Sequence, residues 1–478
     1  MYGYMTQTIL PFDNTYARLP APFFTLQAPA PAPEPSLVAV NRPLADELGI
    51  ALGDEAELGA IFGGNLLPDG AEPLAQAYAG HQFGGFSAQL GDGRAILLGE
   101  IVGPAGRRRD VQLKGSGRTP YSRGGDGRAW LGPVLREYVL SEAMHALGIP
   151  TTRALAAVRT GETVYRQEGG LPGAVLTRVA SSHLRVGTFQ YFAAKGDIAS
   201  LQRLYDYARA RHYPDARDPA AFLRAVIARQ AALVARWLGA GFIHGVMNTD
   251  NTSISGETID YGPCAFMDDY HADQVYSSID RRGRYAYSNQ AHVIVWNMAQ
   301  LATALVPLMP DQDAAIADFT EAVHAMPGQI EAERLRVFGA KIGLAAPREA
   351  DRPLIDDLLA IMQEAGADFT NTFRALGRGD AAAQFADPAP FAAWLARWRA
   401  RLGPNDGGRA SMDAVNPAII PRNHRIEQMI ASAVAGDNAP FHRLTDALAR
   451  PFEEPAGTED LTRPPERGEI VHQTFCGT

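Results

Sequence analysis

The spacing of apolar residues changes near residue 182, and this change limits the folds open to the chain. Before that point, apolar residues form short runs with strand-like alternation, interrupted by one helical stretch over residues 130–147. After it, nearly every periodic segment has helical spacing, as in residues 220–238. Strands followed by helices predict an α+β protein rather than one in which the two alternate.

The front half is predicted to form a mixed sheet. Residues 86–90 and 94–101 flank a Gly-Asp-Gly turn, and an Asp-Gly pair between apolar runs predicts a β-hairpin. Residues 110–114 alternate as a third strand, and two more strands are expected at residues 155–165 and 173–178.

The back half is predicted to be mostly helical. Helical spacing occurs at residues 220–238, 291–308, 313–325, 329–342, 354–365 and 391–402. We expect four regions: an N-terminal arm and extension (1–80), a nucleotide-binding region (81–182), a helical region with the catalytic loop (183–450) and a weakly structured tail (451–478).

Composition narrows the classes of function. The 44 basic and 53 acidic residues give a net charge of −9, so the chain is not a general nucleic-acid coater. Two cysteines cannot build a disulfide framework or a structural Cys-zinc site. We find no signal peptide and no apolar run of about 18 residues. These features predict a cytoplasmic protein without nucleic-acid or membrane partners.

Two features of the front half could bind a phosphate group. The Gly91-Asp92-Gly93 turn could let backbone N–H groups approach one, although alone it is better explained as a ligand-free turn. Lys114 ends the next strand and could reach phosphate oxygens if a helix carboxylate held it. Glu137 is the natural partner and Glu142 a less favoured one. Taken alone, this feature is better explained as a surface lysine and a solvated helix glutamate.

Two features of the back half follow the order of a protein kinase. A kinase catalytic loop reads His-Arg-Asp with an Asn five residues after the Asp, and an Asp-Phe-Gly motif follows. Here His244 and Asn251 keep the outer spacing, and Asp260-Tyr261-Gly262 follows. Asn and Asp oxygens suit Mg²⁺ on a triphosphate. The order of these features predicts a kinase-like nucleotide site.

One position departs from that pattern. Val246 stands where a kinase has its base, and valine cannot accept a proton. Asp250 is the only nearby carboxylate in the loop that could take this role. Three alternatives remain open: a kinase of proteins or small molecules with a relocated base, a different transfer reaction, or a non-catalytic ATP-binding pseudokinase scaffold.

Long segments resemble the selenoprotein O family, called YdiU in bacteria. They are YAGHQFGGFSAQLGDGRAILLGE, DVQLKGSGRTPYSRGGDGRAWLGPVLREY, HGVMNTDNTSISGETIDYGP and NPAIIPRN, and further matches run from FDNTYARLP to the last residues. The resemblance implies a protein-kinase-like bilobal fold with a mixed β N-lobe, a helical C-lobe and extra family-specific helices. It also implies transfer of AMP from ATP, bound in a flipped orientation, to protein Ser, Thr or Tyr hydroxyls, with release of pyrophosphate.

The resemblance further implies roles for individual residues. Asp250 would accept the proton, Asn251 and Asp260 would bind Mg²⁺ or Mn²⁺, and Glu137 would hold Lys114. Asp260 would also contact the nucleotide through its metal. The other nucleotide contacts would come from Gly91, Gly93, Arg94, Lys114, Asp126, Gly127, Arg178 and Arg185. Uridylylation with Mn²⁺ is attributed to bacterial members, so UTP is an alternative nucleotide, and the chain itself is a candidate acceptor.

Several residues outside this set invite simpler interpretations. Cys264 and Cys476 are hypothesised to form a transient, redox-sensitive bond, although two reduced thiols are the more ordinary state. His81 and His183 are predicted to be structural. Packing is a better explanation than self-modification for the tyrosines at positions 270, 276, 285 and 287.

Overall fold

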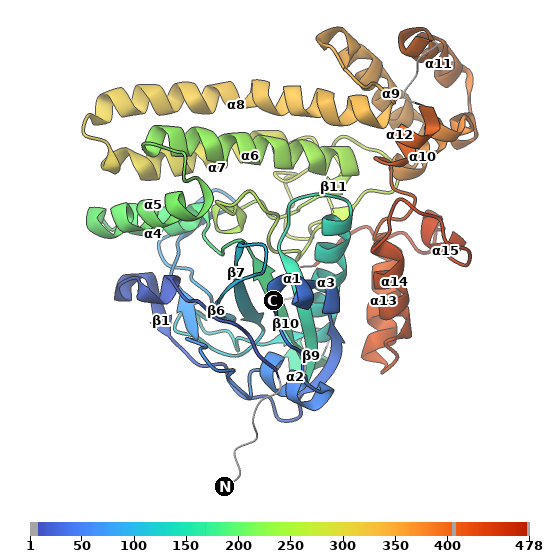
Figure 1. Cartoon of the computed structure of the whole chain (residues 1–478). Coiled ribbons are helices and arrows are strands. Elements are labelled where there is room, and N and C mark those ends of the chain that lie inside the picture. The colour runs from blue at the N-terminus through green and yellow to red at the C-terminus, as the bar shows by residue number, and fades with distance from the viewer. Residues whose placement is uncertain (1–7, 168, 404–407, 476–478) are drawn as a thin grey trace.

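The computed structural model describes residues 8–167, 169–403 and 408–475. It is an α+β structure in which a sheet and its covering helices occupy one end and stacked long helices the other (Figure 1). The division of the sequence near residue 182 is confirmed, because the last strand of the sheet ends at Ala180 and α4 (Val186–Ala194) begins the helical part.

The main sheet has eight antiparallel strands. Its order is β1-β3-β6-β7-β10-β9-β2, and β8 pairs with β10. The bounds are β1 Phe24–Leu26, β2 Ser36–Val40, β3 Leu74–Gln76, β6 Ala95–Val102, β7 Arg108–Lys114, β8 Ala129–Trp130, β9 Arg153–Arg166 and β10 Gly169–Ala180. Strands β7, β9 and β10 match predicted strands and extend beyond them. The first 80 residues, expected to be an arm, contribute β1, β2 and β3, flanked by helices α1 (Arg42–Leu48) and α2 (Glu55–Phe62).

The predicted hairpin over residues 86–101 is wrong. Strand β5 (Gly85–Ser87) pairs with β4 (Gly80–Gln82), whereas β6 pairs with β3 and β7. The turn between them is held by β3 instead, because the backbone N of Asp92 donates to the carbonyl of Gln76 at 2.9 Å. The local Asp-Gly signal was outweighed by pairing with a strand some 20 residues earlier, which local pattern does not reveal.

Helix α3 (Leu131–Ala146) lies at the centre of the sheet-containing part. It packs on β9 and β10, while α13 (Asn423–Val434) and α14 (Ala439–Leu448) cover it from outside (Figure 1). Twelve of its residues are buried, and these include Arg136 and Glu137. Because charged side chains are almost never fully buried unless paired, both residues must have specific partners.

The helical part is built around α6 (Pro219–Ala240), α7 (Gln290–Leu305) and α8 (Gln312–Lys341), which pack on one another (Figure 1). Asp218 caps α6 by accepting from the backbone N of Ala221 at 2.7 Å, and Gly241 ends it with a φ of +68°. Further helices are α5 Ile198–His212, α9 Arg352–Ala365, α10 Phe369–Arg378, α11 Ala389–Leu402, α12 Gly408–Asp413 and α15 Glu459–Thr462.

Two predictions for the helical part need correction. The break predicted between residues 325 and 329 does not occur, because α8 continues through Pro327. Proline removes one hydrogen bond and usually kinks a helix; here packing along α6 and α7 keeps the helix continuous. The tail is also more ordered than predicted, since Thr474 exchanges backbone hydrogen bonds with Tyr276 (2.8 Å) and Ser278 (3.0 Å).

One helical stretch, Gln290–Leu308, is long and apolar enough to cross a membrane, with a mean hydropathy of 1.3. The stretch is not an uninterrupted apolar run, because Gln290, Asn297 and Gln300 lie among its apolar residues. It contacts α4, α6 and α8, which is how the core helix of a globular protein behaves.

Candidate active site

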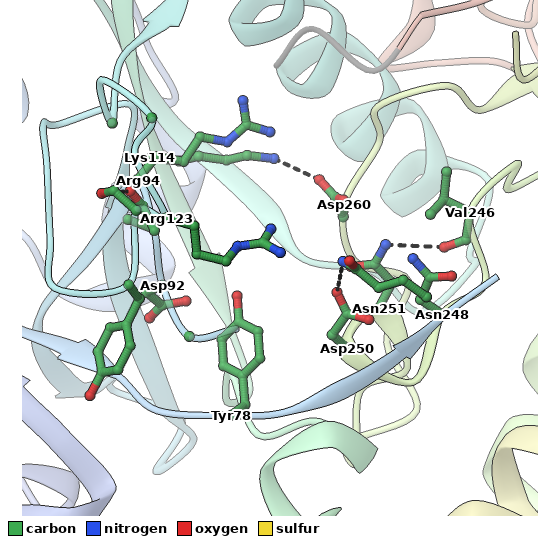
Figure 2. A pocket seen from close by; sticks show the side chains of 18 of the residues that line it. Tyr78, Asp92, Arg94, Lys114, Arg123, Val246, Asn248, Asp250, Asn251 and Asp260 are labelled. Carbon is green, nitrogen blue, oxygen red and sulfur yellow. Dashed lines mark hydrogen bonds and ion pairs between the residues drawn. The ribbon is translucent and has the colours of Figure 1, made fainter. Parts of the chain in front are cut away.

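A cavity of about 570 Å³ brings together nearly all the predicted site residues. It lies between the sheet and the loops that follow β11 (Phe242–Ile243), and its labelled side chains approach from both sides in Figure 2. Its lining includes Gly91, Gly93, Arg94, Lys114, Asp126, Gly127, Arg178, Arg185, Asp250, Asn251 and Asp260. Glu137 is not part of this lining, but it contacts two residues that are.

Lys114, the last residue of β7, is held between two carboxylates. Its Nζ donates to Glu137 on α3 in a short contact, and to Oδ1 of Asp260 at 2.8 Å (Figure 2). Glu142, the less favoured partner, binds Arg153 and Asn41 instead. The structure therefore joins Lys114 to Glu137, and Lys114 also links the sheet to the loop that carries Asp260.

Arg178 on β10 lies in the same buried network. Its guanidinium donates to Oε1 of Glu137 at 3.3 Å and to Oε1 of Gln112 at 2.6 Å. Glu137 thus bridges two cations, and neither Lys114 nor Arg178 needs a ligand to stay in place. Such prepositioned charges can stabilise phosphate oxygens without first reorganising.

Arg185 is buried with unused donors. Its guanidinium carbon lies 4.3 Å from the ring centroid of Tyr78, and Nη1 lies 3.5 Å from Oδ1 of Asp92. Within the described residues, Nε and Nη1 have no hydrogen-bond partner. Arg185 also lines the cavity, and the planar fork of a guanidinium fits phosphate oxygens.

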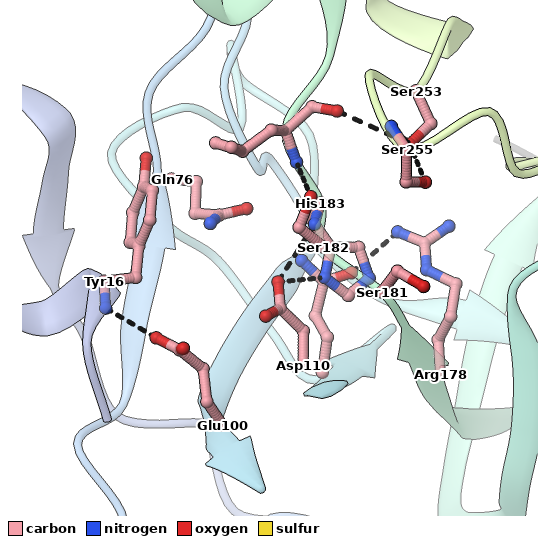
Figure 3. Close-up of polar contacts among 12 residues, drawn as sticks. Tyr16, Gln76, Glu100, Asp110, Arg178, Ser181, Ser182, His183, Ser253 and Ser255 are labelled. Carbon is pink, nitrogen blue, oxygen red and sulfur yellow. Dashed lines mark hydrogen bonds and ion pairs between the residues drawn. The ribbon is translucent and has the colours of Figure 1, made fainter. Parts of the chain in front are cut away.

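A second polar network lies behind these arginines and fixes the backbone between β10 and α4 (Figure 3). Oδ2 of Asp110 accepts from the backbone N of His183 at 2.9 Å and from Nδ1 at 3.0 Å, while Arg211 pairs with the other oxygen. Burial lowers the pKa of His183, so the ring stays neutral and donates to Asp110. His183 is structural, as predicted; so is His81, which bonds Gln190.

The kinase-like loop is fixed mainly by its own backbone. Nε2 of His244 lies 2.9 Å from the carbonyl of Ile259, which ties the loop to the segment that carries Asp260. Asn251 donates through Nδ2 to the carbonyl of Val246 at 3.1 Å (Figure 2). His244 is therefore structural, and the amide oxygen of Asn251 is left to face the cavity.

Asp250 has the properties of a proton acceptor. It is buried, and burial raises its pKa to about 6 against the opposing effects of backbone hydrogen bonding, Gln82 and Arg185. Oδ2 accepts from Nε2 of Gln82 at 3.1 Å, whereas Oδ1 has no partner among the described residues. A carboxylate that lines the cavity and has a pKa raised towards neutrality can accept a proton from a hydroxyl.

Asp260 has the opposite electrostatic environment. Burial alone would raise its pKa, but the charges of Lys114 and Arg94 hold the pKa far below its usual range. Its φ of +67° is left-handed, a region uncommon for residues other than glycine. Strained backbone of this kind often occurs at functional positions, and here it turns the carboxylate towards Lys114.

Asn251 and Asp260 together offer oxygen ligands that fit a divalent cation. One amide oxygen and one ionised carboxylate are the hard donors that Mg²⁺ prefers, and Mg²⁺ usually completes its shell with water and phosphate. No group of three or more His, Cys, Asp or Glu residues suited to a metal occurs in the part of the chain that the structure describes. A cation here would depend on the phosphates of a nucleotide.

The glycine turn also has a role in packing. Gly91 has a φ of +72°, and a Cβ at that position would lie 2.3 Å from the ring of Tyr121. The missing side chain therefore makes room for Tyr121, although the turn still lines the cavity. At the rim, Asp126 is held by Arg166 at 2.8 Å.

Sequence reasoning missed four residues of the site. Gln82 bonds Asp250, Tyr78 lies against Arg185, and the amide oxygen of Asn248 accepts from Phe83 N (3.1 Å) and Tyr285 Oη (2.6 Å). Asp92, assigned to a turn, is buried and accepts from Gln112 at 3.1 Å. Only their position within the glycine-rich and loop motifs could have indicated them.

The structure describes only one of the two cysteines that are hypothesised to form a bond. Cys476 lies outside the described residues. Cys264 is buried, and burial raises the pKa of its thiol to about 12. The thiol is therefore protonated and unreactive while the site keeps this form.

The four tyrosines are packed, as predicted. All are at most 8% exposed. The hydroxyl of Tyr285 donates to Asn248, and that of Tyr287 donates to the carbonyl of Leu238 at 2.6 Å. These hydroxyls are not accessible acceptors in this structure.

Comparison with known proteins agrees with the geometry. A family model described as protein adenylyltransferase SelO matches residues 7–449. A protein nucleotidyltransferase YdiU of Ruegeria pomeroyi is 65% identical over 469 residues, which cover 98% of this chain and 99% of the relative. Proteins of the same name from Jannaschia sp. and Rhizobium meliloti are 61% and 55% identical and cover 98% of this chain, with 99% and 100% of their own lengths aligned.

Proposed function

The chain belongs to the SelO family of protein adenylyltransferases, and we propose that it transfers AMP from ATP to Ser, Thr or Tyr hydroxyls of proteins and releases pyrophosphate. The observation that carries this proposal is the placement of Asp250. Asp250 lines one cavity together with Lys114 and Arg185, while the usual kinase base position is Val246.

In this proposal Asp250 accepts the proton of the acceptor hydroxyl. The hydroxyl oxygen then attacks the α-phosphorus, and the bond between the α-phosphorus and the bridging oxygen breaks. Pyrophosphate leaves with the electron pair of that bond. A carboxylate with a pKa of about 6 is ionised at neutral pH, which is the state this step requires.

The basic cluster would bind the triphosphate and offset the charge on the departing pyrophosphate. Lys114 and Arg178 are already oriented by Glu137, and Arg185 has donors to offer. Catalysis of this kind consists mainly of positioning and electrostatics. Gly91, Gly93, Arg94, Asp126 and Gly127 would complete the nucleotide contacts from the cavity wall.

Asn251 and Asp260 would hold Mg²⁺ or Mn²⁺ with the nucleotide. Such a cation supplies charge neutralisation and alignment of the phosphates. The low pKa of Asp260 keeps this ligand ionised across the physiological range. UTP is the alternative nucleotide.

We further propose that the sheet region and the helical region correspond to the two lobes of a protein-kinase-like fold, with the later helices as additions. The order of β7, α3, the His244 loop and Asp260 along the chain supports this. The four regions 1–80, 81–182, 183–450 and 451–478 would then be extension, N-lobe, C-lobe and tail. A cytoplasmic location without nucleic-acid partners remains part of this proposal.

The products distinguish this function from its rivals. Purified protein, ATP, Mg²⁺ or Mn²⁺ and casein as a generic acceptor should yield pyrophosphate in proportion to modified protein, and Asp250→Asn should abolish both while ATP still binds. Formation of ADP would indicate a kinase with a relocated base. Binding of ATP without either product would indicate a scaffold.

A further inference from the structure

A short hairpin, β4–β5, lies against the catalytic loop. Three hydrogen bonds join the two: His81 N to Thr249 Oγ1 at 2.7 Å, Gln82 Nε2 to Asp250 Oδ2 at 3.1 Å, and Phe83 N to Asn248 Oδ1 at 3.1 Å. Any chain held by this hairpin would therefore lie beside Asp250.

The hairpin presents apolar side chains to solvent. Phe83 at its turn is 40% exposed and Phe86 is 45% exposed. Ile279, from the loop after the kinase-like motif, is 51% exposed and lines the same cavity as Phe83. Large exposed apolar groups, two of them at the edge of the cavity and one on the adjoining hairpin strand, indicate a surface that is covered by a partner.

The loop beside the hairpin is strongly basic. Arginines occupy positions 281, 282 and 284, and Arg281 and Arg282 are exposed. The only carboxylate within this turn, Asp280, is buried and accepts from the backbone N of Arg284 and Tyr285 at 2.9 and 2.7 Å. Among the described residues, Arg281 and Arg282 form no ion pair with a carboxylate.

The hairpin and the basic loop form one continuous surface. The rings of Phe83 and Tyr285 are 5.2 Å apart, and Arg284 lies over Trp296, whose ring contacts His81 of the hairpin. We call the exposed residues of these two elements the acceptor face: Phe83, Phe86, Ile279, Arg281 and Arg282.

We propose that the acceptor face binds the segment of a substrate protein that carries the modified hydroxyl, and that this segment combines apolar residues with acidic ones. This inference rests on the proposed function. Phe83, Phe86 and Ile279 would take the apolar side chains, and Arg281 and Arg282 would pair with acidic neighbours of the acceptor residue. The hydroxyl would then point towards Asp250 from the side opposite Lys114.

Three of the five residues of the acceptor face, Phe86, Arg281 and Arg282, do not line the cavity assigned to the nucleotide. Of the basic groups assigned to the triphosphate, Arg94 and Lys114 lie across the cavity from Asn248 and Asp250 (Figure 2). Unpaired exposed arginines outside that cluster are thus available to a second ligand. A surface with apolar residues beside basic ones suits an acidic, partly apolar peptide segment better than a second phosphate group.

Charge reversal tests this assignment with two synthetic peptides. One carries a single serine flanked by leucine and glutamate; in the other, lysine replaces every glutamate. The double variant Arg281→Glu with Arg282→Glu is compared with wild type and with a control, Arg42→Glu with Arg203→Glu, which alters two exposed arginines outside the cavity. The rate of AMP transfer to each peptide gives kcat and the KM for that peptide. Hydrolysis of ATP to AMP and pyrophosphate in the absence of peptide shows whether the nucleotide site still works.

The wild type should prefer the glutamate peptide. The double variant should raise KM for it about tenfold at low salt, improve the lysine peptide and leave peptide-free turnover unchanged, whereas the control should resemble wild type. Equal KM values for both peptides in all proteins would overturn the assignment while leaving nucleotidyl transfer intact.

Binding measured without chemistry separates the two proposals. A fluorescent glutamate peptide with alanine in place of serine should bind the wild type and lose affinity in the double variant and in Phe86→Ser. Absence of AMP transfer with this binding intact would refute the function alone. Binding unaffected by the variants, or displacement by single-stranded RNA at lower concentration than by unlabelled peptide, would refute the acceptor face.

Discussion

Replacing Glu137 by alanine tests the buried network on which the site depends. Glu137 is 5% exposed at its side chain and pairs with Lys114 and with Arg178, which are 12% and 4% exposed. The change removes the carboxylate shared by two buried cations. Breaking one buried pair by removing a partner costs about 3–5 kcal/mol.

The lower end of that range applies here. Lys114 keeps Asp260 at 2.8 Å, and Arg178 keeps Gln112 at 2.6 Å, so neither cation is left wholly uncompensated. We expect the free energy of unfolding to fall by about 3 kcal/mol. Because Lys114 would no longer be held from α3, the KM for ATP should rise at least about tenfold.

Urea unfolding and steady-state kinetics measure the two effects. Glu142→Ala is the matched control, because Glu142 is on the same helix and pairs with Arg153 rather than with Lys114. It should lower stability and leave the KM for ATP unchanged. A Glu137→Ala protein that loses less than about 1 kcal/mol and binds ATP normally would refute the proposed network.

Four further outcomes follow from the structure. Activity should fall about tenfold per pH unit below about 6, because Asp250, whose pKa is raised to about 6, must be ionised to accept a proton; a kcat/KM profile that stays flat to pH 5 would contradict this. Gly80→Ala should lower kcat more than it raises the KM for ATP, since its Cβ would lie 2.6 Å from Oδ1 of Asp250; unchanged kcat would show that the carboxylate is not held there. Burial lowers the pKa of Lys341 from 10.5 to about 7. Between pH 7 and pH 10.5 its amine is therefore neutral in the folded protein and protonated in the unfolded chain. Stability should therefore rise with pH in that window, and Lys341→Met should flatten the rise, measured by urea unfolding at pH 7, 8 and 9. Thr474→Val should lower the melting temperature, because Oγ1 donates to the carbonyl of Pro263 at 2.5 Å; an unchanged melting temperature would show that the tail is not held by this bond.

The local sequence pattern predicted those helices and strands whose apolar periodicity extends over many residues and whose ends carry capping or terminating residues. Helix α6 has a capping Asp218 and a terminal Gly241, and both the sequence and the structure place it within two residues of the same ends. Pairing between distant strands is not encoded locally. The hairpin over residues 86–101 was therefore predicted wrongly, and β1 to β3 went unrecognised.

The same holds for the site: residues that belong to motifs could be predicted, whereas the residues that contact them in the fold could not. Lys114, Asp250, Asn251 and Asp260 could be named from residue type, order and resemblance, and they share one cavity. The residues that tune them could not, because Gln82 reaches Asp250 across 168 positions of sequence. A glutamine in a glycine-rich stretch carries no signal until the fold brings it to a carboxylate.

Paired isotopic labelling tests nucleotidyl transfer most directly. Wild-type and Asp250→Asn proteins would be incubated with casein, Mg²⁺ or Mn²⁺, and ATP labelled at either the α- or the γ-phosphate. We expect casein to retain label only from α-labelled ATP and only with the wild type. Label on casein from γ-labelled ATP, or α-label transfer that survives loss of the Asp250 carboxylate, would contradict the proposed function or its proton acceptor.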